Sequence, residues 1–576
     1  MKTVYIFFIL IFISCQQPTR DIDFTTVFEK SNGTETATYE QAIQYFKNLA
    51  EVHPEICIDS MGVTDSGKPL HYVTLDIDGD DLNGENNTPK TKILINNGIH
   101  PGESDGIDAT MMLFRDFANG KLILPKNVTI VTIPIYNIGG SLNRNSTTRT
   151  NQNGPKSYGF RGNARNYDLN RDFIKCDTEN AKTFAQIFHT INPDIFIDNH
   201  VSNGADYQYT LTHLLTQHNK LGGEPGKYLN EKFRPQLESK LKENNWDITP
   251  YVNVFNRPPD GGFTQFLDSP RYSTGYTTLF NSLGMMLETH MLKPYKQRVE
   301  GTYEFMKTVI EIAETDGQQI KKLREKQKAK WQVGDHYPLA WKLDTTKFSN
   351  LTFKGFEADT ITSQVTGLPR LKYNRSKPKN IDIKYQDYYQ PKTTVTIPKV
   401  YLIPQGWRHV IDLLKLNHIE FKTLEKDTVM TVESYKIENF DTRKNPYEGH
   451  YLHYNTTVKS EAKQYEFKAG DLIIETSQPG MRYLLETLEP SAPDSFFNWN
   501  FFDTILQQKE GFSPYVWEDK AAQFLKTHPK IQIQFNIKKS YDPDFANNGY
   551  AQLDWIHKQS ENYEKAHLQY PVFRIN

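Results

Sequence analysis

Apolar, strand-like runs alternate with helical segments from residue 39 to about residue 300. Residues 93–99 read as a buried strand that ends at His100, and residues 194–199 form another that ends at His200. Residues 178–190 carry apolar side chains at helical spacing. Strands that alternate with helices predict a mostly parallel sheet. The expected fold class is therefore α/β, with a mixed, mostly parallel sheet flanked by helices and followed by a smaller β-rich or α+β domain.

Three side chains in these segments have the chemistry of metal ligands. His100 and Glu103 lie three positions apart at a strand-to-helix junction, which lets both reach one ion. His200 ends another strand, and the carboxyl ends of parallel strands meet at one edge of a sheet. Catalytic zinc sites use three protein ligands and leave one position open. Taken alone, His100 and Glu103 would more often form a solvated turn, and His200 would be a hydrogen-bonded core histidine, so the prediction depends on the residues around them.

An arginine-rich segment lies between these candidates. Residues 160–173 contain Arg161, Arg165 and the run Asp168-Leu169-Asn170-Arg171. Arginine suits bidentate binding of a carboxylate. With this segment, the ordered set resembles the zinc metallocarboxypeptidase family M14, of the carboxypeptidase A type. The resemblance implies one Zn²⁺ per chain and hydrolysis of the C-terminal peptide bond of peptides by a metal-activated water.

The resemblance implies that His100, Glu103 and His200 hold the zinc ion. It also implies that Asn170 and Arg171 bind the terminal carboxylate of the substrate. The arginine that polarises the scissile carbonyl matches Arg161, with Arg165 as the alternative.

Two further roles match residues farther along the chain. Glu288 follows an apolar run over residues 282–287, so it looks like the general base of the family. The tyrosine that closes over the substrate is expected to be Tyr272, with Tyr276 as the competitor, because the spacing to Glu288 is short. Taken alone, each of these residues would more often be a solvated acid or a packed aromatic side chain.

The N-terminus predicts export. A basic start and an apolar run over residues 4–13 lead into Phe12-Ile13-Ser14-Cys15, which resembles a bacterial lipobox. We expect residues 1–15 to be a lipoprotein-type signal peptide, residues 16–38 a tether, and Cys15 a lipid anchor in the bacterial cell envelope. Ordinary signal cleavage nearby is the alternative.

The remaining chain divides at a charged helix end. We expect a zinc carboxypeptidase domain over residues 39–330 and an accessory β-rich or α+β domain over residues 331–576. Residues 201–280 lack periodicity and predict a lid or a binding loop.

Short β-like runs dominate after residue 331. They include residues 393–397, 400–403 and 531–535, and helices are expected at residues 407–416 and near 501–508. The aromatic stretch at residues 496–502 has two interpretations, a carbohydrate or peptidoglycan platform and a buried core or interface. Clustered aromatic side chains mostly bury themselves, which favours the core.

The net charge and the order of the motifs reduce the number of candidate functions. Lys and Arg total 67 and Asp and Glu total 69, for a net charge of −2, so the basic face that nucleic-acid binding needs is not indicated. The alternatives to a carboxypeptidase are a cell-wall peptide amidase or endopeptidase, an amino-acid deacylase, and a non-catalytic peptide-binding lipoprotein. The Asn170-Arg171 pair favours a substrate with a free carboxylate next to the scissile bond.

Overall fold

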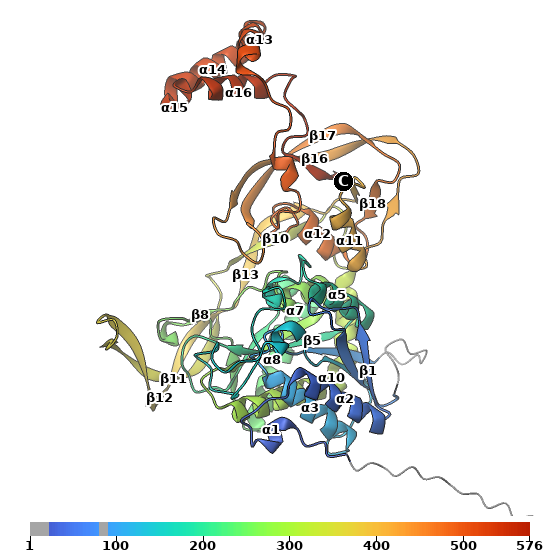
Figure 1. The fold of residues 1–576 in the computed structure, drawn as a ribbon, viewed down its shortest axis with the longest axis vertical. Coiled ribbons are helices and arrows are strands. Elements are labelled where there is room, and N and C mark those ends of the chain that lie inside the picture. Colours follow the sequence, from blue (N-terminus) through green and yellow to red (C-terminus); the bar gives the residue numbers. More distant parts are fainter. Residues whose placement is uncertain (1–21, 80–89) are drawn as a thin grey trace, which may run out of the picture.

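The computed structural model describes residues 22–79 and 90–576. The predicted signal peptide with Cys15, and residues 16–21 of the predicted tether, lie outside these residues. Within the described ranges, no helix combines the length and the apolar character needed to cross a membrane. Figure 1 shows a lower body, an upper body stacked on it, a hairpin that projects sideways, and a small helical module at the far end.

The lower body is built on an eight-stranded mixed sheet. Its central strands pair in parallel, whereas β1–β2, β2–β4 and β6–β9 are antiparallel. This agrees with the predicted mixed, mostly parallel sheet. In pairing order the strands are β1 (Ile56–Met61), β2 (Leu70–Leu75), β4 (Val128–Ile133), β3 (Thr91–Asn96), β5 (Ile195–Ser202), β9 (Leu283–His290), β6 (Leu211–Leu215) and β7 (Ile248–Pro250).

Helices cover both faces of this sheet (Figure 1). The long helix α10 (Tyr295–Lys328) packs with α3 (Asp105–Ala118) on one face, and α2 (Tyr39–Val52) contacts α3. Helix α5 (Glu179–Ile191) lies on the opposite side. The strands between these layers are buried throughout, as in β4 and β5, because a parallel sheet with helices on both faces has no solvent side.

Residues 201–280 are more regular than the sequence predicted. They contain β6, β7, the two-residue strand β8 (Phe263–Thr264) and several short helices. Polar and Gly/Pro-rich composition hid these short elements, which the sheet and α10 hold in place. The helices are α6 (His218–Leu221), α7 (Gly223–Tyr228), the π-helix η2 (Leu229–Phe233), α8 (Arg234–Glu243), η3 (Pro259–Gly261) and α9 (Ser273–Leu279).

The upper body is β-rich, with two helices on its sheet. Strands β10 (His336–Leu343) and β13 (Tyr389–Thr396) connect it to the lower body. Helices α11 (Arg408–Leu416) and α12 (Met481–Leu488) pack on an antiparallel six-stranded sheet. In pairing order its strands are β15 (Lys422–Thr423), β18 (Leu472–Glu475), β14 (Val400–Ile403), β19 (Gln569–Ile575), β16 (Thr428–Thr442) and β17 (His453–Phe467).

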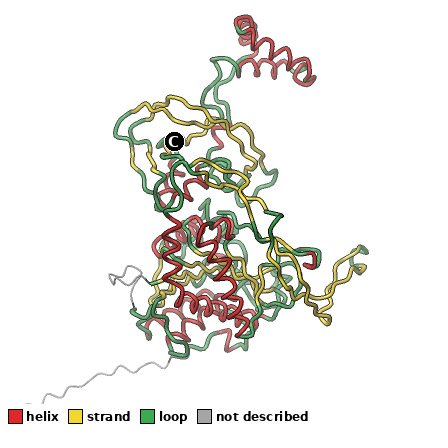
Figure 2. The backbone as a smooth tube through the Cα atoms, turned by 180° about the vertical axis from the view of Figure 1, so that it is seen from behind, coloured by secondary structure: helices red, strands yellow, loops and turns green. Residues whose placement is uncertain are grey.

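The projecting hairpin belongs by sequence to the second half but pairs with the first. Strands β11 (Ser349–Thr362) and β12 (Pro369–Gln386) form a long antiparallel pair, and β12 also pairs in parallel with β8. A further bridge joins Tyr207 to Gly355. The hairpin extends well beyond the lower body in both ribbon views (Figures 1 and 2).

The helical module contradicts one strand prediction. Residues 531–535 were expected to be β-like, but they lie in α14 (Pro529–Tyr541), which packs with α13 (Pro514–Thr527), α15 (Pro543–Ala546) and α16 (Gly549–Lys558). The helix predicted near residues 501–508 is only the short 3₁₀ helix η4 (Asp503–Leu506).

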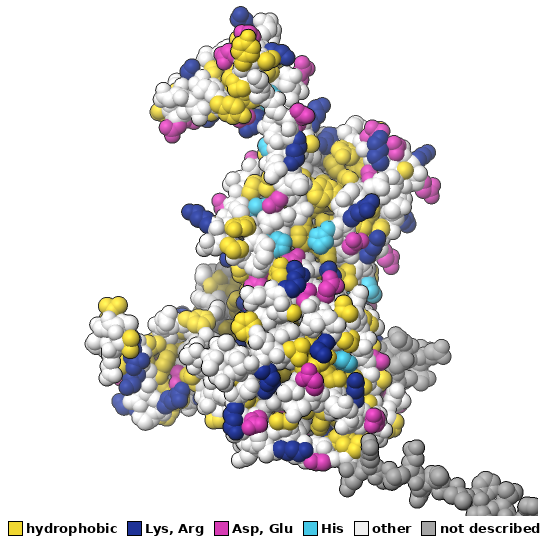
Figure 3. Space-filling view, viewed as in Figure 1, with side chains coloured by type: hydrophobic (Ala, Val, Ile, Leu, Met, Phe, Trp, Pro, Cys, Tyr) yellow, Lys and Arg dark blue, Asp and Glu magenta, His cyan; other side chains and the backbone are white. Residues whose placement is uncertain are grey.

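The aromatic stretch is core, not a surface platform. Phe496, Phe497, Trp499 and Phe502 are each fully buried. They belong to one continuous hydrophobic cluster that also contains the core of the lower body. On the face drawn in Figure 3, positive and negative side chains are interspersed, in line with the near-neutral charge.

Candidate metal and substrate site

The sheet brings the predicted metal ligands to one edge. Strands β3, β5 and β9 are parallel neighbours, so their carboxyl ends point the same way. His100 follows β3, on a turn where Gly98 adopts a φ of 66°, a conformation that favours glycine. His200 lies within β5, and Glu288 pairs with it in register on β9.

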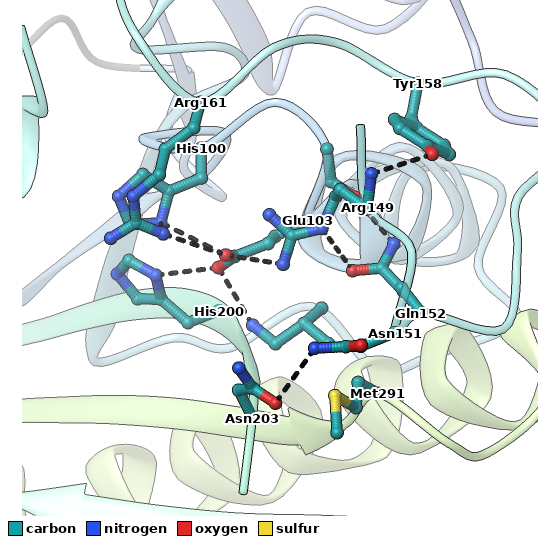
Figure 4. A network of polar contacts seen from close by, with 12 residues as sticks. His100, Glu103, Arg149, Asn151, Gln152, Tyr158, Arg161, His200, Asn203 and Met291 are labelled. Carbon is teal, nitrogen blue, oxygen red and sulfur yellow. Dashed lines mark hydrogen bonds and ion pairs between the residues drawn. The ribbon is translucent and has the colours of Figure 1, made fainter. Parts of the chain in front are cut away.

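His100, Glu103 and His200 form a tight, buried group. One ligand atom from each lies within 4.8 Å of the others. The Nδ1 atom of His100 is 3.2 Å from Glu103 Oε1, and the Nδ1 atom of His200 is 3.0 Å from Glu103 Oε2. Figure 4 shows both imidazoles pointing at the carboxylate. Two nitrogen ligands and one oxygen ligand are a donor set that zinc accepts.

The outer contacts of the histidines also suit a metal. His100 Nε2 lies 2.9 Å from Asp168 Oδ1, and His200 Nε2 lies 3.0 Å from Asp198 Oδ2. A carboxylate on the far nitrogen fixes the tautomer and leaves Nδ1 free as a ligand. The side chains therefore fit a zinc ion, with both Nδ1 atoms facing inward.

Glu103 is held ionised by its surroundings. Arg149 Nη2 donates a hydrogen bond to its Oε1 at 2.9 Å, and the Val201 amide donates to Oε2 at 3.0 Å (Figure 4). Burial opposes ionisation, but the positive charges of His100 and Arg149 outweigh it and hold the pKa of Glu103 well below its usual range. The contact with Arg149 was not predicted from the sequence.

A cavity of about 320 Å³ adjoins this group. Most residues singled out in the sequence line it, although they come from segments far apart in the chain. These are His100, Glu103, Arg161, Asn170, Arg171, His200, Tyr272 and Glu288.

The two candidate arginines lie in different places. Arg161 donates two hydrogen bonds to Asp168 Oδ2, at 3.0 and 2.7 Å, and its Nη1 lies 3.3 Å from His100 Nδ1. Arg165 lies outside the cavity lining, over the ring of Tyr167, and donates to the carbonyl of Asp177. The geometry therefore favours Arg161 over Arg165 for contact with a substrate.

Asn170 and Arg171 sit on η1 (Leu169–Arg171), with Arg171 over the ring of Tyr272 at 4.6 Å. The Ser273 amide donates to Asn170 Oδ1 at 3.2 Å. Tyr276 is fully buried away from the cavity and donates to Asn417. Tyr272, and not Tyr276, is thus the tyrosine next to the candidate carboxylate-binding pair.

Glu288 faces the cavity with a free acceptor. Its Oε2 atom is buried and accepts no hydrogen bond from the described residues. Burial raises the pKa of Glu288 to about 8, against the opposing charge of His200. A cation bound nearby would lower this pKa, because an opposite charge favours the ionised form.

Other cavity residues escaped the sequence analysis. Tyr251, Phe255, Phe266 and Asp268 all come from residues 201–280, where no periodicity marked them. A signal for Asp268 existed, since it is the one acid in the run from Gly261 to Pro270, but nothing placed it in the pocket.

Comparisons with known proteins find similarity to carboxypeptidases. Residues 42–198 match the family model described as zinc carboxypeptidase. Carboxypeptidase 2 of Trichophyton rubrum is 19% identical over 487 residues, which cover 81% of this chain and 84% of that protein.

Two solved structures show a partial likeness. A metallo-carboxypeptidase from Burkholderia cenocepacia aligns with a TM-score of 0.36 and 16% identity, over 48% of this chain and 70% of its own. Carboxypeptidase A from Helicoverpa armigera aligns with a TM-score of 0.36 and 12% identity, over 49% of this chain and 74% of its own.

Proposed function

We propose that this chain, whose residues 42–198 match the zinc carboxypeptidase model, is a metallocarboxypeptidase that removes single residues from the free C-terminus of peptides. One observation carries the proposal. The His-Glu-His group, the Asn170-Arg171 pair and Glu288 all line the same cavity. A metal group, an anion-binding pair and an acid in one cavity match the needs of hydrolysis next to a terminal carboxylate.

The substrate's last residue is oriented by its carboxylate. Asn170 supplies an amide donor and Arg171 a planar guanidinium that can bind a carboxylate through two hydrogen bonds. Tyr272, already in contact with Arg171, closes the site from the side. These contacts would hold the C-terminal peptide bond beside the metal group and predict a requirement for a free C-terminus.

The reacting atoms meet Arg161 and Glu288. His100, Glu103 and His200 would hold a zinc ion, which would supply Lewis acidity for the carbonyl and for a water nucleophile at neutral pH. Arg161 donates to the carbonyl oxygen as negative charge develops on it. The carboxylate of Glu288 accepts the water's proton and passes it to the leaving amine.

A matched pair of peptides tests the proposal. Peptides of one sequence, with a free or an amidated C-terminus, are incubated with the full chain, with and without a zinc chelator. We expect loss of the last residue from the free peptide only, its disappearance with chelator and its return with added Zn²⁺. Equal cleavage of both peptides would indicate an endopeptidase or amidase instead.

We also propose that the protein is exported and anchored in the bacterial cell envelope through Cys15, where its substrates are peptides or peptidoglycan peptides. The sequence Phe12-Ile13-Ser14-Cys15 after an apolar run supports this. Labelled fatty acid should enter the wild-type protein and not a Cys15→Ser variant, which should leave the membrane fraction. Equal labelling of both would reject the anchor.

A further inference from the structure

A second cavity, of about 930 Å³, lies where the upper body meets the lower body. Residues of β10, β13 and β17 and of the loops at 443–452 and 491–498 line it, together with Arg271 from the lower body. No described residue lines both this cavity and the substrate cavity. Its volume falls within the range of about 300–1,000 Å³ that small-molecule sites occupy.

The lining of this upper cavity is basic. Arg271, Lys392 and Arg443 are positively charged, and none of the described residues that line the cavity is Asp or Glu. The chain as a whole has a net charge of −2, so the excess of cations is a property of this place. Further lining residues carry hydroxyl or amide groups, namely Thr393, Asn455, Thr456, Thr457, Ser491 and Asn498.

Arg271 is a fixed and balanced part of the wall. Its Nε and Nη2 atoms each lie 2.7 Å from Asp494 Oδ1, and its guanidinium lies over the rings of Tyr447 and Trp499 at 5.6 and 5.0 Å. The next residue in the chain, Tyr272, lines the substrate cavity. This short segment therefore contributes to the walls of both cavities, but the charge of Arg271 is already paired.

Lys392 and Arg443, by contrast, have no acidic partner. Neither side chain makes an ion pair or a hydrogen bond with any residue in the described part of the chain. Arg443 lies over the ring of Tyr447 at 4.5 Å, which supports the guanidinium by its face and leaves its N–H groups free to donate. Either cation alone would be an ordinary solvated side chain; here two from different segments line one cavity without an acid.

Two hydroxyl groups of the lining are also available. The side chains of Thr393 and Ser491 make no hydrogen bond within residues 22–79 and 90–576. A hydroxyl group can donate to an oxyanion. The cavity therefore combines free cations with free neutral donors, which is the chemistry that binds carboxylates and phosphates.

We propose that the upper cavity is a second binding site, which takes a small anionic ligand with carboxylate or phosphate groups. Arg443 can bind such a group through two parallel hydrogen bonds, and Lys392 contributes a point charge. A ligand with several anionic groups can engage both cations at once. The site is separate from the substrate cavity, and the inference does not depend on the proposed carboxypeptidase function.

A matched pair of blocked peptides tests the proposal. Triglutamate and triglutamine, each acetylated and amidated, have nearly the same size, differ in three carboxylates and lack the free C-terminus that the substrate cavity is proposed to need. Calorimetry with the zinc-loaded full chain should show binding of the triglutamate peptide and not of the triglutamine peptide. Its affinity should fall as the salt concentration rises from about 50 to about 500 mM, because salt screens exposed charges.

Inorganic phosphate is the third arm of this measurement. Binding of the triglutamate peptide would assign carboxylates to the site, and binding of phosphate alone would assign phosphate; either result supports the proposal. Equal binding of the two peptides, or no binding of the triglutamate peptide and of phosphate, would overturn it.

Variants assign the binding to this cavity. Arg443→Gln and Lys392→Gln should each weaken the affinity for the bound probe by about tenfold, as expected for the loss of one hydrogen bond between charged groups. Arg408→Gln and Lys426→Gln remove exposed cations of the upper body outside the lining, so they serve as matched controls and should keep the wild-type affinity. Unchanged affinity in both cavity variants would place the anion elsewhere, for example at Arg171, and would overturn the inference.

Discussion

Glu288 is the residue that most sharply separates an enzyme from a peptide-binding protein. Glu288→Gln preserves its size but removes the ability to accept a proton. General-base catalysis typically supplies about 10²–10⁴-fold, so kcat should fall by at least that order. Zinc should stay bound, because His100, Glu103 and His200 are untouched. Metal analysis and turnover measured on one preparation check both parts.

The two ways in which this prediction can fail have different meanings. Near-normal turnover with zinc bound would mean that another group accepts the proton. Loss of zinc would mean that Glu288 is itself a ligand.

Arg161 is expected to act on the transition state more than on binding. Arg161→Ala should lower kcat by about 10²–10³, the usual effect of removing one oxyanion donor, with a much smaller change in KM. Arg165→Ala serves as the control, because Arg165 lies outside the cavity lining. Steady-state kinetics with one peptide measure kcat and KM for both variants. An Arg161 variant that lost only affinity for the peptide would contradict a role of Arg161 in the transition state.

Asp108 predicts a pH dependence of stability. Burial raises the pKa of Asp108 to about 6, against the hydrogen bonds that it accepts from the Tyr295 hydroxyl and the Ala37 amide. The folded state therefore binds this proton more tightly than the unfolded state. The free energy of unfolding should fall as the pH rises from about 4 to about 6, by about 3 kcal/mol.

Asp108→Asn should remove this fall. Urea unfolding of the wild type and the variant at pH 4 and pH 7 measures the change in the free energy of unfolding. All other titratable groups are the same in both proteins, so the difference between the two changes belongs to Asp108. Equal pH dependence of the two would show that Asp108 titrates normally.

At the residue scale, the sequence predicted the candidate metal ligands, because they lie in short motifs at the ends of strands. His100, Glu103 and His200 follow strands whose order could be inferred, and they do converge. Asp268 and Tyr251 could not be predicted as neighbours of these residues, because loops and short helices bring them together. Only the folded structure shows that these side chains line the same cavity as the metal ligands.

Among the elements, one loop of the upper body reaches the site. In residues 443–452, the Glu448 carboxylate accepts a hydrogen bond from the Asp168 amide at 2.8 Å, and His450 Nε2 lies 2.7 Å from Asp177 Oδ2. Asp168 in turn contacts His100 and Arg161. The upper body thus helps to orient residues of the candidate metal site.

Glu448→Ala should therefore lower activity without touching substrate. We expect a loss of kcat or zinc affinity of up to about tenfold, because outer contacts of a metal site act indirectly. Glu461→Ala, an exposed acid on β17, is the control. Zinc titration and kinetics of both variants check the effect; identical behaviour would make the loop contact structural only.

Strand and helix predictions failed where local pattern and packing disagree. Residues 531–535 alternate apolar and polar side chains as a strand does. They nevertheless form part of α14, which begins at Pro529, and Phe535 packs with Phe545 in a small separate core. Proline fits the first turn of a helix, and neighbouring helices override the alternating pattern.

The main hydrophobic core of the described residues spans both bodies. Arg482 of α12 donates to Asn281 Oδ1 at 3.1 Å and to the Lys220 carbonyl at 2.8 Å. The ring of Tyr483 stacks on Phe280 at 5.9 Å. The sequence placed a boundary near residue 330, but it could not show that the two sides share a buried interface.

A chain that ends at residue 330 should therefore be unstable. It would expose Phe280, Tyr276 and their neighbours, and leave buried polar groups such as Asn281 without partners. We expect aggregation or strong binding of a hydrophobic dye, compared with the full chain at equal concentration. A soluble, zinc-binding, active fragment would show that the lower body folds alone.

The connection between the bodies, residues 329–335, is short and mostly exposed, whereas the surfaces that it joins are buried. A protease could cut it without reaching the core. The two pieces would then remain a noncovalent complex, as a nicked protein does, and would sediment as one particle. They would separate only when denaturant opens the interface, so a band shift on a denaturing gel would reveal a cut that activity would not.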